Sequence, residues 1–216
     1  MANQTRERIT MIMKLTPQML LAPVISMIVG AGCVTIHRDR LVHIVQPAPP
    51  ADSARAINGT YRYYYFASWA DTQTPQSTLE YFEEEFVDAL NESGYFNTLR
   101  PGDGDDVHID ARVEAYVGGA GQAAALVGAW SLGTIPVWIT TEYRAKFVVR
   151  TKDGVTRDYA LDDAFTDFVW LPFIVVTPFY SPSKVMKHVL NNIYKTLIQK
   201  MQIEEILPPA KTGGGT

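Results

Sequence analysis

The chain has 216 residues, a formal net charge of -4, one cysteine and 47% hydrophobic residues. This length suits one domain of ordinary size, and the apolar fraction excludes a wholly disordered protein. A single cysteine excludes an intrachain disulfide, and the mild acidity leads us to expect no nucleic-acid partner, because such a partner needs a basic surface. The mean hydropathy of -0.04 argues against a protein with several membrane spans.

Residues 1–32 have the order of segments found in a secretory signal peptide. Arg6 and Lys14 belong to a positively charged start, and an uncharged apolar run follows Lys14. The run is short and Pro23 interrupts it, which disfavours a permanent membrane span. We therefore expect residues 1–32 to be removed from the mature protein. The start of translation stays open among three methionines, which are Met1, Met11 and Met13.

The only cysteine follows this segment directly, in the sequence Val29-Gly30-Ala31-Gly32-Cys33. The stretch resembles the lipobox, the signal-peptidase II site of bacterial lipoproteins, in which small residues precede the modified cysteine. Ala31 and Gly32 match that pattern, whereas Gly30 stands where the family usually has Leu. The resemblance implies cleavage after Gly32, a diacylglycerol on the thiol of Cys33 and an acyl chain such as palmitate on its amine. Three acyl chains exceed what stable membrane anchoring requires.

The resemblance also implies a location. Val34, and not Asp, follows the cysteine, which by similarity to enterobacterial sorting favours the outer membrane over the inner one. We therefore expect a membrane anchor through the N-terminal lipid, on the periplasmic side of the cell outer membrane. A secreted or soluble periplasmic protein with an ordinary cleavage site is the alternative.

Composition divides the rest of the chain into a tether, a domain and a tail. Residues 33–59 include the Pro-rich run 46–53, and we expect a flexible, lipid-anchored tether there. Residues 60–203 carry the periodic patterns of a single α/β periplasmic domain, and residues 204–216 are expected to be disordered. Polar residues of the tether are expected to face solvent or lipid headgroups; they are His37, Arg38, Arg40 and His43.

Periodicity predicts the first elements of the domain. An aromatic-rich strand over 60–66 precedes a helix over 77–90, where Ser77-Thr78-Leu79-Glu80 fits a capping box. Strict alternation then predicts a strand over 107–117, with His108 on its exposed polar face.

The second half predicts a hairpin and a helix. Strands are expected over 141–150 and 155–166, joined by a turn at Asp153-Gly154. An amphipathic pattern predicts a helix over 183–201. Together these elements predict an α+β fold, in which a small, mostly antiparallel sheet of three to five strands is covered by two helices.

This order of elements is loosely similar to that of periplasmic α/β envelope lipoproteins. They include the curli-secretion-channel-like, penicillin-binding-protein-activator-like and exopolysaccharide-export lipoproteins. The resemblance lies in element order and lipid anchoring, and no sequence motif of the domain contributes to it.

Two apolar loops, 118–138 and 168–180, contain no charged residue and connect elements of the predicted core. Three interpretations are open. The loops pack on each other and on the sheet, or they form an exposed patch for self-association or for an envelope protein partner, or they enter the bilayer beside the lipid anchor. The aromatic residues predicted to contact a membrane or a partner are Trp130, Trp138, Trp170 and Phe173.

Known catalytic patterns are missing from the sequence. Gly118-Gly119-Ala120-Gly121 lacks the Lys and Ser/Thr of a phosphate-binding loop, and no Gly-x-Ser-x-Gly motif occurs. We therefore expect no enzyme, no metal site and no cofactor apart from the covalent lipid at Cys33.

The sequence predicts an outer-membrane-anchored lipoprotein with a non-enzymatic role in cell-envelope assembly or export, acting through protein–protein contacts. One alternative is an oligomeric subunit of a secretion or polysaccharide-export apparatus with membrane-contacting loops. The other is a soluble periplasmic binding module or hydrolase.

Overall fold

The computed structural model describes four ranges of the chain: 33–42, 57–68, 74–175 and 182–208. The predicted signal peptide with its cleavage site at Gly32, the Pro-rich part of the predicted tether and most of the predicted tail lie outside these ranges.

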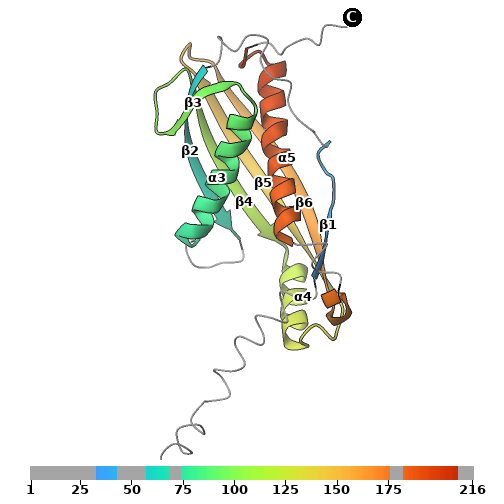
Figure 1. The fold of residues 1–216 in the computed structure, drawn as a ribbon. Helices are drawn as coiled ribbons and strands as arrows, with labels where there is room; N and C mark the ends of the chain where they lie inside the picture. The colour runs from blue at the N-terminus through green and yellow to red at the C-terminus, as the bar shows by residue number, and fades with distance from the viewer. Residues whose placement is uncertain (1–32, 43–56, 69–73, 176–181, 209–216) are drawn as a thin grey trace, which may run out of the picture.

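A six-stranded mixed sheet forms the centre of the molecule (Figure 1). Its spatial order is β1-β6-β5-β4-β2-β3, and β2 runs parallel to both β3 and β4 while the other pairs are antiparallel. The α+β prediction is confirmed, with slightly more strands than expected. The strands are β1 (Cys33–His37), β2 (Ile57–Ala67), β3 (Phe96–Pro101), β4 (Val107–Val117), β5 (Val137–Thr151) and β6 (Thr156–Val169).

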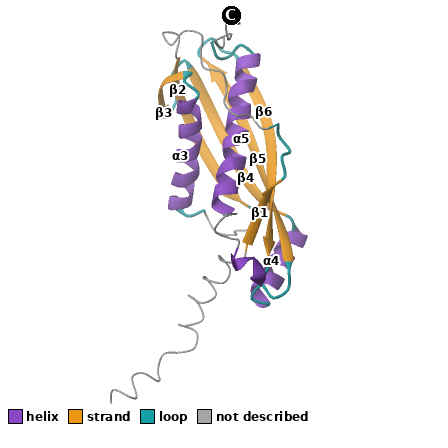
Figure 2. Ribbon diagram, turned by 45° about the vertical axis from the view of Figure 1, so that its right-hand side comes forward, coloured by secondary structure: helices purple, strands orange, loops and turns teal. Residues whose placement is uncertain are grey.

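Two long helices cover one face of this sheet (Figure 2). They are α3 (Gln76–Glu92) and α5 (Pro182–Ile203). The core lies between these helices and the sheet, where aromatic side chains from both layers meet. Phe86 of α3 packs against Tyr63 of β2 and Tyr194 of α5, and the hydroxyl oxygens of the two tyrosines lie 2.9 Å apart.

The alternating pattern of β4 explains its position in the middle of the sheet. Ile109, Ala111, Val113 and Ala115 are fully buried against the helices. The prediction that His108 is exposed is wrong, because its ring is buried on the opposite face, where Nδ1 lies 3.0 Å from the Thr60 hydroxyl of the neighbouring strand.

The capping box predicted at Ser77 does not form. The helix begins one residue earlier, with Pro75 as its N-cap and no side-chain cap hydrogen bond. The backbone N–H groups of Thr78 and Leu79 donate instead to the Pro75 carbonyl, so Ser77 lies within the first turn. Proline before a helix sets the backbone direction without needing a donor of its own.

The tether prediction is wrong for Cys33–His37, which forms the edge strand β1. This strand pairs with β6 from Cys33↔Val169 to His37↔Phe165. Side chains strengthen the pairing, because the Thr35 hydroxyl donates to the carboxylate of Asp167. Residues 57–59, at the other end of the predicted tether, belong to β2.

The tail prediction is also wrong for its first residues. Leu207 is buried in the core, and its backbone N–H donates to the carbonyl of Met201 in α5. The chain folds back after α5, and burial of the Leu207 side chain in the core stabilises this turn.

The predicted apolar loops contain regular structure. Gly119–Trp130 forms the helix α4, residues 137–138 begin β5, and residues 168–169 end β6. A short 3-10 helix, η2 (Leu171–Val175), follows β6. Sequence periodicity did not predict α4, because small and apolar side chains occupy nearly all sides of this helix and it has no polar face.

Candidate functional site

Exposed apolar side chains gather at one end of the molecule, where α4, the start of β5, the end of β6 and η2 lie together (Figure 1). Trp130 is 92% exposed, Leu126 73% and Trp138 65%. We call this end the apolar pole. It is formed by the exposed side chains of Leu126, Val127, Trp130, Leu132, Ile135, Trp138, Trp170 and Leu171.

The pole exists because β5 is longer than its neighbour. β4 ends at Val117, opposite Thr141, so residues 137–140 of β5 extend past it. Helix α4 follows β4 almost directly and packs on this extension. The approach is close: a Cβ atom added at Gly128 would lie 2.8 Å from a methyl carbon of Val137.

The two uncharged segments contact each other. The backbone N–H of Leu171 donates to the carbonyl of Gly133 at 2.7 Å, which links η2 to the turn after α4. Phe173 is half-buried and packs edge-on against Trp170, with ring centroids 5.5 Å apart. The backbones thus pack as the first interpretation expects, yet the tryptophans predicted for contact stay exposed, as the other two require.

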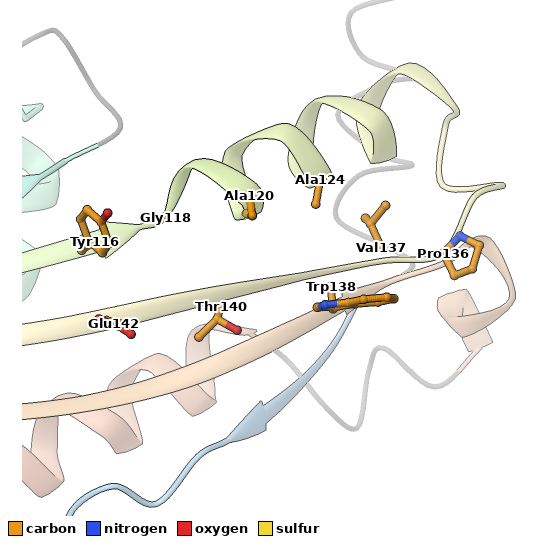
Figure 3. Close-up of a pocket in the computed structure, with 10 residues that line it drawn as sticks. Tyr116, Gly118, Ala120, Ala124, Pro136, Val137, Trp138, Thr140 and Glu142 are labelled. Atoms are coloured by element: carbon orange, nitrogen blue, oxygen red, sulfur yellow. The ribbon is translucent and has the colours of Figure 1, made fainter.

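A cleft of about 480 Å³ runs beneath the pole, between α4 and β5 (Figure 3). Ala120 and Ala124 point into it from the helix, and Trp138 lies along β5 on the other side. Glu142 closes the polar end of the cleft. Its carboxylate bonds to Arg40 at 2.7 Å and to Arg144 at 2.9 Å.

These two guanidinium groups set the protonation state of the Glu142 carboxyl. The hydrogen bond from Arg40, followed by that from Arg144, holds the pKa of the carboxyl below its ordinary value. Glu142 is therefore ionised and paired at neutral pH, which suits a structural ion pair better than proton transfer. The remainder of the lining is largely small or apolar.

Cys33, the predicted lipidation site, lies beside the pole. It is the first residue of β1, and the register places it in one row with Val169 of β6 and Val137 of β5. Its side chain is buried, and burial, followed by the charge of Asp167, raises the pKa of the thiol to about 12. A thiol in this position is unreactive while β1 is paired.

A buried polar cluster fastens the other end of β1. The carboxylate of Asp163 is fully buried, and His37 Nε2 lies 2.8 Å from it. Asp163 also accepts hydrogen bonds from the backbone N–H of Arg40 and from the side chain of Asn192 in α5. His37 Nδ1 faces Asp39 at 2.7 Å, so both ring nitrogens contact carboxylate oxygens.

The sequence did not indicate this cluster. We predicted that His37 and Arg40 belong to a solvated tether, whereas they lie against β6. His37 and Asp163 are 126 residues apart and share no motif. Only the pairing of β1 with β6 brings them together.

None of the helices within the described ranges is both long enough and apolar enough to span a membrane.

No family model and no curated protein matches this sequence. Solved structures share its arrangement weakly. A minor lipoprotein from Acinetobacter baumannii is 13% identical with a TM-score of 0.35, covering 73% of this chain and 99% of that one. A PelC dodecamer from Paraburkholderia phytofirmans is 11% identical with a TM-score of 0.34, covering 76% and 97%. A Xanthomonas campestris protein of the DUF330 family is 12% identical with a TM-score of 0.33, covering 74% and 89%.

Proposed function

We propose that this protein is an outer-membrane lipoprotein, anchored by acyl chains on Cys33, with a non-enzymatic role in cell-envelope assembly or export. The observation that carries the proposal is the position of Cys33. It lies in the same strand row as Val169 and Val137, at the end of the domain where large apolar side chains are exposed. A lipid anchor and an apolar surface at one end suit a protein that faces a membrane with that end.

The opposite end and the open face of the sheet would then be available to other envelope proteins. Helices α3 and α5 cover one face, and on the other face Tyr64 and Phe66 are 48% and 43% exposed. The guanidinium of Arg112 lies 4.6 Å from the ring centroid of Phe66. Aromatic residues and Arg are enriched in protein–protein interfaces, which supports action through protein contacts.

The anchor is tested by the variant Cys33→Ala in the full-length chain. We expect the wild-type chain to incorporate labelled palmitate and to sediment with outer membranes, and the variant to lose the label. Val34→Ala serves as a control, because it changes the neighbouring residue and keeps the acyl acceptor. A wild-type chain without label, or a variant with as much label as the wild type, would contradict the proposed anchor.

A further inference from the structure

We propose that the apolar pole is itself a membrane-binding surface, which enters the boundary between headgroups and acyl chains of a phospholipid bilayer. The proposal deepens the proposed function, since it assumes the anchor at Cys33 and adds a second contact with the same membrane. Its occupant is the lipid surface, and a protein partner at the pole is an outcome of the test described below.

The first argument is that no flexible linker separates the anchor residue Cys33 from the sheet. Cys33 is already paired with Val169, and the fastening continues through Thr35 and His37 to Asp167 and Asp163. Neighbouring strands lie about 4.8 Å apart, so β5 begins about 10 Å from the strand that carries the anchor. Acyl chains on Cys33 therefore hold the pole at the bilayer surface.

The second argument is the chemistry of the pole. Trp130 and Trp138 project indole rings, which prefer the interfacial region of a bilayer because they combine an apolar body with a polar N–H group. Leu126 adds an exposed aliphatic side chain from the same helix as Trp130. Residues 115–141 contain no charged side chain, so no ion loses its hydration when the pole enters the headgroup region.

The third argument compares the pole with another exposed apolar residue, Ile203, at the C-terminal end of α5. Ile203 is as exposed as Leu126, at 73%, but it lies between the charged residues Lys200 and Glu204. A single exposed apolar residue among charges is ordinary for a protein surface. The pole differs because its eight exposed apolar side chains belong to two segments, 118–138 and 168–180, that contain no charged residue.

The experiment uses a full-length reporter chain with the substitutions Trp69→Phe, Trp138→Phe and Trp170→Phe, so that Trp130 is its only tryptophan. The acylated protein is reconstituted into vesicles of zwitterionic phospholipid. The acyl chains carry bromine either near the headgroup or near the terminal methyl group, because bromine quenches indole emission on contact. Near-ultraviolet circular dichroism verifies that the reporter chain is folded.

We expect bromines near the headgroup to quench Trp130 more strongly than bromines near the methyl end, because an interfacial helix lies about 5–10 Å deep in this boundary. Leu126→Glu in the reporter chain should weaken binding of the pole to the bilayer roughly tenfold. The fraction of molecules with the pole in the bilayer falls less than the binding constant does, so the quenching should drop to a third or less. The matched control Ile203→Glu removes an equally exposed residue at the far end and should leave the quenching unchanged.

Palmitate labelling and quenching separate the two proposals. A labelled protein on vesicles whose Trp130 is quenched no more than in solution keeps the anchor and overturns the membrane contact; a second copy of the chain covering the pole would give this result. An unlabelled protein that is still quenched refutes the anchor and supports the contact. An unlabelled protein that does not bind vesicles overturns both, and equal effects of the two glutamate variants would also overturn the assignment to the pole.

Discussion

The side chains that fix β1 are few and deeply placed. Asp163 is fully buried with four donors around its carboxylate, from His37, Arg40, Ala164 and Asn192. A buried carboxylate persists only when its oxygens are satisfied in this way. The single residue therefore connects β1, β6 and α5.

Asp163→Asn should destabilise the fold by about 2–4 kcal/mol, because the amide NH₂ replaces an acceptor and faces donor groups. Urea unfolding measures the change. The neighbouring variant Asp162→Asn is the control, since that carboxylate is 61% exposed and lies 3.5 Å from Arg40; its effect should stay within about 0.5 kcal/mol. Equal losses in both variants would argue against a clamp at Asp163.

Asp167 introduces a dependence on pH. Burial raises the pKa of its carboxyl, and hydrogen bonds from Thr35 and Cys33 offset part of this effect. The folded state therefore holds the proton more strongly than the unfolded state does. The stabilisation is complete below the ordinary pKa of 3.8 and is lost as the pH rises through the raised value.

Asp167→Asn should therefore be more favourable to stability at neutral pH than at acidic pH, because the amide keeps an acceptor for Thr35 without a buried charge. Unfolding free energies of variant and wild type at pH 3 and pH 7 measure this difference. Asp158→Asn, at an exposed position of the same strand, reports the general effect of removing one negative charge. A difference for Asp167→Asn that is the same at both pH values contradicts the prediction.

Among the helices and strands, those with a periodic pattern of apolar residues could be predicted from the sequence, and those without one could not. β4 alternates strictly and α5 carries a helical apolar stripe, so both were predicted within a few residues. β1 has only five residues and is defined by its partner, whereas α4 is rich in alanine and glycine with no polar face. For such segments the tertiary contacts decide the structure, and they are not visible in local sequence.

The close packing of α4 on β5 gives a test at this scale. Gly128→Ala should destabilise the fold by about 1–2 kcal/mol, because the new methyl group would meet Val137 and the overpacking exceeds the helix-propensity gain of about 1 kcal/mol. Gly119→Ala in the same helix is the control, since nothing lies within 4 Å of its added Cβ. Thermal unfolding should show the first variant destabilised and the second unchanged or stabilised. The reverse order would mean that α4 does not pack closely on β5.

For the molecule as a whole, only part of the arrangement at the apolar pole could be predicted from the sequence. The absence of charge in 118–138 and 168–180 marked both segments, and two of the aromatic residues chosen there, Trp170 and Phe173, contact each other. The row that brings Cys33 to the same end was not predictable, because it depends on β1 pairing with a strand more than 120 residues away. The predicted tether would have separated the anchor from the pole.

This difference can be measured directly. A flexible insertion of about 20 Gly and Ser residues between Cys33 and Val34 would give the domain a reach of about 25 Å from its anchor. We expect palmitate labelling to persist and quenching of Trp130 by brominated lipid to fall about threefold or more, because the local concentration of the pole at the membrane drops. A rigid Pro-rich insertion of equal length is a useful comparison. Unchanged quenching would show that the pole holds the membrane without help from the short anchor.

The place of β1 at the edge of the sheet also sets an order of events during synthesis. Its partner β6 is the last strand of the sheet, so the N-terminal strand stays without a partner until almost the whole domain has emerged. During that interval the sulfur of Cys33 is accessible to a modifying enzyme, whereas the unmodified side chain is buried once β1 has paired. The topology thus makes closure of the N-terminal edge of the sheet one of the last steps of folding, so a modification of the Cys33 sulfur has to precede the pairing of β1 with β6.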